Sequence, residues 1–182
     1  MRLSPDIKIK TKRLILKPVE DLYIDDITKN FTAEITRYMP FNPKGNRNDI
    51  LNFVSESKKS LLENTDLVMI VIDHNEEFMG CCGIHNINEE SVELGLWLKK
   101  GAHGVGLGTE IISSLIKFSE NNFTFKYILY PVDKSNIASK KIPEKLGFIP
   151  YKEYIKNKGV SSYLNIIEYR KYSDQSHIIN CL

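Results

Sequence analysis

The segment KKGAHGVGLGTEIISSL, Lys99–Leu115, decides the fold. Gly104, Gly106 and Gly108 alternate directly before a run with helical periodicity. Glycine residues carry no side chains that could block the backbone N–H groups at the start of a helix. These N–H groups lie at the positive end of the helix dipole, where phosphate groups bind. No lysine follows Gly108, so the segment is not a P-loop, and its glycine spacing differs from the G-x-G-x-x-G of dinucleotide sites. A tight turn between strand and helix remains the structural alternative.

The composition indicates one packed α/β domain. The chain has 182 residues, of which 42% are hydrophobic and 26% charged, and its formal net charge is +2. A charge this small does not indicate nucleic-acid binding. No apolar run is long enough for a signal segment or a membrane span, so we expect a cytoplasmic protein without membrane contact.

The cysteines indicate neither a disulfide framework nor a metal site. Cys81 and Cys82 are adjacent, and Cys181 makes the count odd. The adjacent pair lacks the spacing of metal ligands, and no pair of histidines lies near it. We interpret Cys81 and Cys82 as small strand residues in a reducing compartment.

Hydrophobic periodicity predicts alternating strands and helices along most of the chain. Strands are expected at 14–19, 66–73, 77–87, 91–100, 125–132, 148–157 and 160–172. Helices are expected at 20–31, 34–39, 49–62, 109–120 and 135–147. The strands on either side of helix 109–120 should be parallel with a right-handed crossover, and the flanking hairpins should make the sheet mixed.

Several motifs in order resemble the GNAT superfamily of acyl-CoA-dependent N-acetyltransferases. They are HGVGLG at 103–108, N-x-x-S at 136–139 and EKLGF at 144–148. TKRLILKP at 11–18 and VELGLWL at 92–98 resemble the ribosomal-protein acetyltransferases of the RimJ/RimL type. The resemblance implies an α/β (α+β) GNAT fold: a mixed, mostly antiparallel, twisted sheet of six to seven strands flanked by helices. A splayed parallel pair would form the acyl-CoA site, in one domain over 1–172 with a tail at 173–182.

The same resemblance implies acetyl-CoA as cosubstrate and no metal. Main-chain N–H groups of 104–109 would hold the pyrophosphate, and main-chain groups of Leu96 and Leu98 would pair with pantetheine. Lys141 would meet the 3′-phosphate, unless it is only a solvated helix lysine. Asn136 would contact the cofactor, unless it only caps its helix. The implied cofactor-binding residues are Leu96, Leu98, His103, Gly104, Val105, Gly106, Leu107, Gly108, Thr109, Asn136 and Lys141.

Two positions depart from the family pattern. His103 replaces the usual Arg or Gln, which removes a permanent charge near the expected pyrophosphate. Pro143 lies inside the last helix, where it deletes an N–H donor and disfavours the helical conformation of Ile142. We therefore expect a kink or an early stop in that helix.

The expected reaction is attack of a neutral amine on the thioester, which requires a base because amines are protonated at pH 7. Glu93 is the predicted base, on a strand face shared with Gly95 and Trp97. It could equally be a solvent-exposed strand residue or make a structural hydrogen bond. Trp97 would shape the acceptor pocket or pack in the core.

Ser139 is the predicted partner of the departing CoA sulfur, and its alternative is a helix-surface serine. Tyr130 is a weaker alternative acid. His74 and His85 are interpreted as turn and strand-end residues, because nothing in the sequence pairs either with a nucleophile.

The leading prediction is an N-acetyltransferase whose acceptor is a protein N-terminus or a small amine, with a homodimer compatible with the fold. A non-catalytic acyl-CoA-binding module is the alternative, and it would bind acetyl-CoA without turnover. A mononucleotide-binding protein is a third reading, which predicts heat protection by ATP or GTP and none by CoA.

Overall fold

The computed structural model describes residues 2–40, 46–159 and 162–173. Their strands form one sheet in the order β1-β2-β3-β4-β5-β6-β8-β7. The strands are β1 (Ile9–Lys10), β2 (Leu14–Pro18), β3 (Leu67–Asp73), β4 (Phe78–His85), β5 (Ser91–Leu98), β6 (Tyr127–Asp133), β7 (Ile149–Gly159) and β8 (Ser162–Tyr172). The sheet therefore has eight strands rather than six to seven, because the two residues of β1 add to the edge. Positions 174–182 of the expected tail, with Cys181, lie outside the described residues.

All five predicted helical segments are present, and one further 3-10 helix, η3 (Lys100–Ala102), follows β5, which ends at Leu98 rather than at residue 100. The helices are η1 (Asp21–Tyr23), α1 (Ile24–Asn30), η2 (Ile35–Tyr38), α2 (Arg47–Glu63), η3, α3 (Leu107–Asn122) and α4 (Ile137–Lys145). The segment predicted as one helix at 20–31 divides into η1 and α1. None of the helices in the described part is long and apolar enough to cross a membrane.

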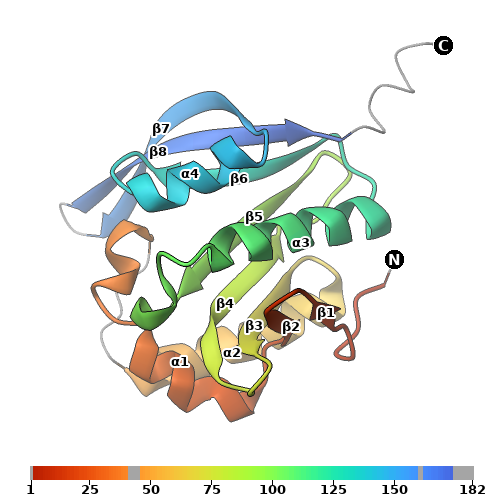
Figure 1. Cartoon of the computed structure of the whole chain (residues 1–182), viewed down its shortest axis with the longest axis vertical. Helices are drawn as coiled ribbons and strands as arrows, with labels where there is room; N and C mark the ends of the chain where they lie inside the picture. The colour runs from red at the N-terminus through yellow and green to blue at the C-terminus, as the bar shows by residue number, and fades with distance from the viewer. Residues whose placement is uncertain (1, 41–45, 160–161, 174–182) are drawn as a thin grey trace.

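Helices cover both faces of the sheet (Figure 1). On β3, Met69 and Val71 belong to the core beneath α3, whereas Ile70 and Ile72 belong to the core beneath α1 and α2. Six of its seven residues are buried for this reason. The sheet thus separates two hydrophobic cores, one on each face.

The sheet contains one parallel pair among the described strands, β5 and β6, joined by α3. The pairing covers only Ser91 to Glu93 on β5, opposite Tyr127 to Leu129 on β6. Both strands continue beyond this point, β5 to Leu98 and β6 to Asp133. They therefore part after Glu93, which confirms the predicted splayed pair.

Helix α4 continues past Pro143 to Lys145, so the early stop expected at this proline does not occur. Pro143 is buried, and its carbonyl accepts a hydrogen bond from the Phe148 N–H at 3.0 Å. The Gly147 N–H reaches the Glu144 carbonyl at 3.4 Å, and Gly147 has a φ of 77°. These are the bonds of a Schellman motif, which ends the helix at the predicted glycine.

Candidate active site

The parting of β5 and β6 opens into a cavity of about 760 Å³. Residues 94–97 of β5 line one wall, and residues 130–133 of β6 line the opposite wall. Residues of α1, α2, β3, β4, β7 and β8 and the start of α4 also line the cavity. Its volume lies within the range of sites that bind small molecules and cofactors.

The glycine segment follows the open end of β5 and forms an uncapped start to α3. Gly106 is the N-cap residue of α3, has a φ of 82°, and supplies no side chain to cap the first turn. Gly104 has a φ of 77°, a conformation that residues with a side chain rarely adopt. The first N–H groups of α3 thus receive no side-chain cap, and residues 103–106 are exposed.

Gly108 lies close to side chains of two neighbouring elements. A Cβ atom at this position would lie 2.9 Å from Ile142 Cδ1 of α4 and 3.5 Å from Leu96 Cδ1 of β5. The start of α3 therefore packs closely against both of the elements that flank the cavity.

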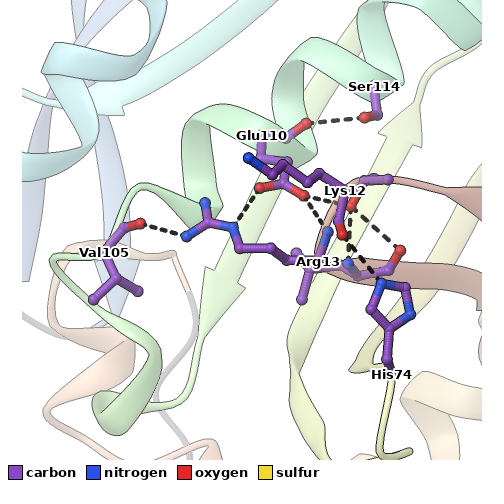
Figure 2. Close-up of polar contacts among 8 residues, drawn as sticks. Lys12, Arg13, His74, Val105, Glu110 and Ser114 are labelled. Atoms are coloured by element: carbon purple, nitrogen blue, oxygen red, sulfur yellow. Dashed lines mark hydrogen bonds and ion pairs between the residues drawn. The ribbon is translucent and has the colours of Figure 1, made fainter.

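Arg13 holds the glycine segment from the N-terminal part of the chain. Figure 2 shows its side chain reaching the Val105 carbonyl, at 2.8 Å from Nη1, and the Glu110 carboxylate, at 2.7 Å from Nε. The Glu110 carboxylate also accepts hydrogen bonds from the Thr11 hydroxyl and the Arg13 N–H. Burial raises the pKa of Glu110, but these hydrogen bonds outweigh it and hold the pKa below its usual value.

A permanent positive charge is therefore present at the loop, although His103 does not provide it. A Cβ at Gly106 would lie 3.7 Å from Arg13 Nη2, so the guanidinium lies beside the bare backbone. His103 Nε2 instead lies 2.8 Å from the Leu98 carbonyl, where it ties the loop to the end of β5. Sequence reasoning missed Arg13, although the residue belongs to the TKRLILKP motif.

Two of the residues predicted on the last helix, Asn136 and Ser139, also line the cavity. The Asn136 side chain accepts the Ser139 N–H at 3.2 Å, so it caps α4. The hydroxyls of Ser139 and Tyr130 lie 2.9 Å apart and form a hydrogen bond. Burial raises the pKa of Tyr130 to about 12, which keeps its phenol protonated at neutral pH. Lys141 lies on the same helix, away from the buried core.

Glu93 lines the cavity at the last residue of β5 that pairs with β6. Its carboxylate accepts a hydrogen bond from Asn86 Nδ2 at 3.4 Å. His85 lies directly opposite in the β4–β5 ladder, and Asp66 contacts the His85 ring. Sequence reasoning missed this grouping, because Asp66 and His85 are 19 residues apart.

The remaining sequence interpretations concern the core. Trp97 packs against Phe31 and Phe78, with ring centroids 5.0 and 5.8 Å apart, and also lines the cavity. Cys81 and Cys82 are buried and free, and burial raises the pKa of both thiols. The described residues contain no cluster of side chains able to hold a metal ion.

With this fold and cavity, the chain belongs to the GNAT acetyltransferase family, whose domain it matches over residues 13–149. It is an N-acetyltransferase, an acyltransferase of class EC 2.3.1. The uncharacterized N-acetyltransferase p20 of Bacillus licheniformis is 25% identical to it over 174 residues, covering 90% of this chain and 97% of that protein. The uncharacterized N-acetyltransferase C18E5.08 of Schizosaccharomyces pombe is 27% identical over 157 residues, covering 78% and 84% of the two chains.

Solved structures share the fold at low identity. RimL, a ribosomal L7/L12 α-N-protein acetyltransferase in complex with coenzyme A, superposes with a TM-score of 0.81 at 12% identity, over 92% of this chain and 99% of that one. The spermidine N-acetyltransferase of Vibrio cholerae, in complex with CoA and spermine, gives 0.77 at 18% identity, over 90% and 98%. RimJ of Mycobacterium smegmatis gives 0.81 at 14% identity, over 97% and 94%.

Proposed function

We propose that this enzyme transfers the acetyl group of acetyl-CoA to a primary amine by direct attack within a ternary complex. The observation that carries the proposal is the parting of β5 and β6 after Glu93, with the uncapped start of α3 following the open end of β5. A gap between strands accepts an extended amide-bearing chain, and an uncapped helix start accepts phosphate. Coenzyme A carries both of these parts, pantetheine and pyrophosphate, in one molecule.

The proposed cofactor contacts follow from this arrangement. The pyrophosphate would accept hydrogen bonds from main-chain N–H groups at 104–109, beside the Arg13 guanidinium. The pantetheine amides would pair with the open edge of β5 at Leu96. The Leu98 carbonyl already accepts a hydrogen bond from His103, so Leu98 is the weaker of the two predicted strand contacts. Lys141 on α4 remains the proposed contact to the 3′-phosphate.

The chemistry of transfer is proposed to take place between Glu93 and Ser139. The Glu93 carboxylate would draw the acceptor ammonium to the closed end of the gap, where its proton is removed. The Ser139 hydroxyl, held by its hydrogen bond with Tyr130, would protonate the departing sulfur. Holding both reactants in one cavity supplies much of the rate.

We propose that the acceptor amine enters the cavity in its protonated, positively charged form. Carboxylates of Asp49 and Glu56 on α2 line the cavity together with Glu93, whereas Lys156 is its one lysine among the described residues. Aromatic side chains of Phe31 and Trp97 also line it, and such rings attract ammonium groups. A peptide N-terminus and a polyamine both fit this description. Among the structural neighbours, one is named for ribosomal protein L7/L12 and another for spermidine.

The test is CoA thiol release from acetyl-CoA with a panel of amines. Peptides that begin with Ser, Ala or Met form one set, polyamines and aminoglycosides form two others, and acetylated versions of each amine are the controls. We expect turnover with at least one set and none with its acetylated control. Calorimetric binding of acetyl-CoA without turnover of any amine would instead support a non-catalytic binding module. Heat protection by ATP but not by CoA would contradict both readings.

A further inference from the structure

The imidazole of His85 lies in a slot made by two glycines. Gly83 of β4 faces Gly95 of β5 in the ladder, two residues along each strand from the pair of His85 and Glu93. A Cβ at Gly83 would lie 2.4 Å from His85 Nε2, and a Cβ at Gly95 would lie 3.7 Å from it. Real Cβ atoms do not approach as closely as 2.4 Å, so the ring can occupy this place only because residue 83 has no side chain.

Asp66 fixes which ring nitrogen carries the proton. His85 Nδ1 lies 3.3 Å from Asp66 Oδ1, which also accepts the Asn86 N–H at 3.2 Å. The hydrogen bond with His85 is the main reason that the pKa of Asp66 lies below its usual value, so Asp66 is a carboxylate at neutral pH. A carboxylate only accepts hydrogen bonds, and the neutral ring must therefore carry its proton on Nδ1. Its lone pair is then on Nε2.

Nε2 faces the place where the two parallel strands part. Gly95 follows Glu93 by two residues on the same face of β5, and Glu93 is the last residue that pairs with β6. His85, Glu93 and Gly95 all line the cavity. Nε2 has no hydrogen-bond partner among residues 2–40, 46–159 and 162–173, and the side chain is 34% exposed. A proton acceptor is thus available at the end of the gap where the acceptor amine would arrive.

We propose that His85, oriented by Asp66, is the catalytic base, an inference that rests on the proposed acetyl transfer. Nε2 takes one proton from the acceptor ammonium, and the neutral amine attacks the thioester carbon. The C–N bond forms, the C–S bond breaks, and a second amine proton passes through the Ser139 hydroxyl to the sulfur, which leaves as CoA thiol. The imidazolium then returns its proton to water. Glu93, beside the ring in the ladder, stabilises both the arriving ammonium and the imidazolium.

The other titratable groups that line the same cavity are Tyr38, Asp49, Glu56, Asp66, Cys81, Cys82, Glu93, Tyr130, Asp133, Tyr154 and Lys156. Burial raises the pKa of Tyr130 and Tyr154 and of both thiols, so none of these four ionises near neutral pH.

The kinetic test compares His85→Asn with His74→Asn. The first change keeps a donor for Asp66 but removes the base, whereas His74 lies on the β3–β4 turn with its Nε2 at the Lys12 carbonyl. We expect His85→Asn to lower kcat/KM for the amine roughly 100-fold at pH 7. The difference in kcat/KM between His85→Asn and the wild type should become smaller above the pKa of the acceptor amine. The Kd for CoA should not change. His74→Asn should match the wild type. A His85→Asn enzyme within twofold of the wild type, or a loss that is equal at all pH values, would overturn the proposal.

A second measurement does not depend on activity or on a variant that folds. Imidazole ¹⁵N chemical shifts of the wild-type protein report which nitrogen of His85 carries the proton. We expect the Nδ1–H form, and the Nε2–H form would overturn the proposal. A wild type that releases no CoA with any amine would refute the proposed function and the role of His85 together. If His85→Asn kept full turnover while Glu93→Gln was inactive, the role of His85 would be refuted, but the proposed acetyl transfer would stand.

Discussion

Helices α3 and α4 both begin beside the gap between β5 and β6, but they satisfy their first N–H groups in opposite ways. At α4 the Asn136 side chain accepts the Ser139 N–H, so the chain supplies its own cap. At α3 the N-cap is Gly106, which has no side chain to offer. One helix start is therefore suited to receive a ligand, and the other to hold Ser139 still.

Gly106→Glu should have the largest effect, because it places a carboxylate at the ligand-receiving helix start and forces a side chain into a positive φ. We expect CoA affinity to fall about 100-fold, or roughly 3 kcal/mol. Titration calorimetry with CoA measures it. Gly101→Glu is the matched control, because a Cβ there meets nothing within 4 Å. If both variants bound CoA with equal affinity, the start of α3 would not be the ligand-binding helix start that distinguishes it from α4.

Ser139→Ala tests the other helix start by removing the hydroxyl while leaving the backbone N–H of residue 139 and the Asn136 cap intact. We expect kcat to fall by about 10- to 100-fold with little change in the Kd for CoA, because a positioned acid acts on the departing sulfur. Steady-state kinetics and calorimetry separate the two quantities. Ser135→Ala is the control on the same segment. Loss of CoA binding with unchanged kcat would assign Ser139 to cofactor binding instead.

Glu110→Gln tests how the α3 start is held in place. The wild-type carboxylate accepts hydrogen bonds from Thr11 and Arg13, and we expect the neutral amide to lower the free energy of unfolding by about 1–2 kcal/mol at pH 7. The pKa of Glu110 is lowered in the fold, so its contribution is complete above its unfolded value and is lost as pH falls through the folded value. Urea unfolding should therefore show a difference at pH 7 that disappears at acid pH.

Glu120→Gln is the control for that measurement, on the same helix and without an ion pair to a described residue. It should unfold like the wild type at both pH values. A difference between wild type and Glu110→Gln that persisted unchanged into acid would show that packing, and not charge, holds the helix start.

Asn136→Ala should have the smallest effect, since its side chain is already used as a cap. We expect a loss of roughly 0.5–1 kcal/mol of stability and a CoA affinity within twofold of the wild type. Asn46→Ala removes the equivalent cap of α2, where the Asn46 side chain accepts the Asn48 N–H. In thermal unfolding it should lower the stability of the protein by the same amount. A selective loss of CoA binding in Asn136→Ala would restore Asn136 as a cofactor contact.

Local sequence was sufficient for most of the fold. The apolar run from Leu67 to Ile72 and the 3.6-residue periodicity of α3 depend only on which residues need burial, and both elements lie where they were predicted. The two-residue β1 was not predicted, because so short a segment has no periodicity. Pro143 was expected to kink α4 or to stop it early, and the early stop does not occur: the proline is buried within the helix, which ends in a Schellman motif at Gly147.

The candidate site was predicted less completely. Glu93 and Ser139 line one cavity, and the glycine segment forms the start of α3, but their proposed roles stay predictions. The contacts of Arg13 and His85 were missed, since each residue meets a partner that is distant in the sequence. Arg13 meets Glu110 across 97 residues, and His85 meets Asp66 across 19.

The sequence by itself determined the order of strands and helices, the bare start of α3 and the family, because periodicity and glycine spacing are local properties. Only the tertiary structure decided what lies beside that bare backbone and which histidine nitrogen is left open to the cavity. Charge pairing and ring orientation depend on contacts between segments that the fold alone brings together.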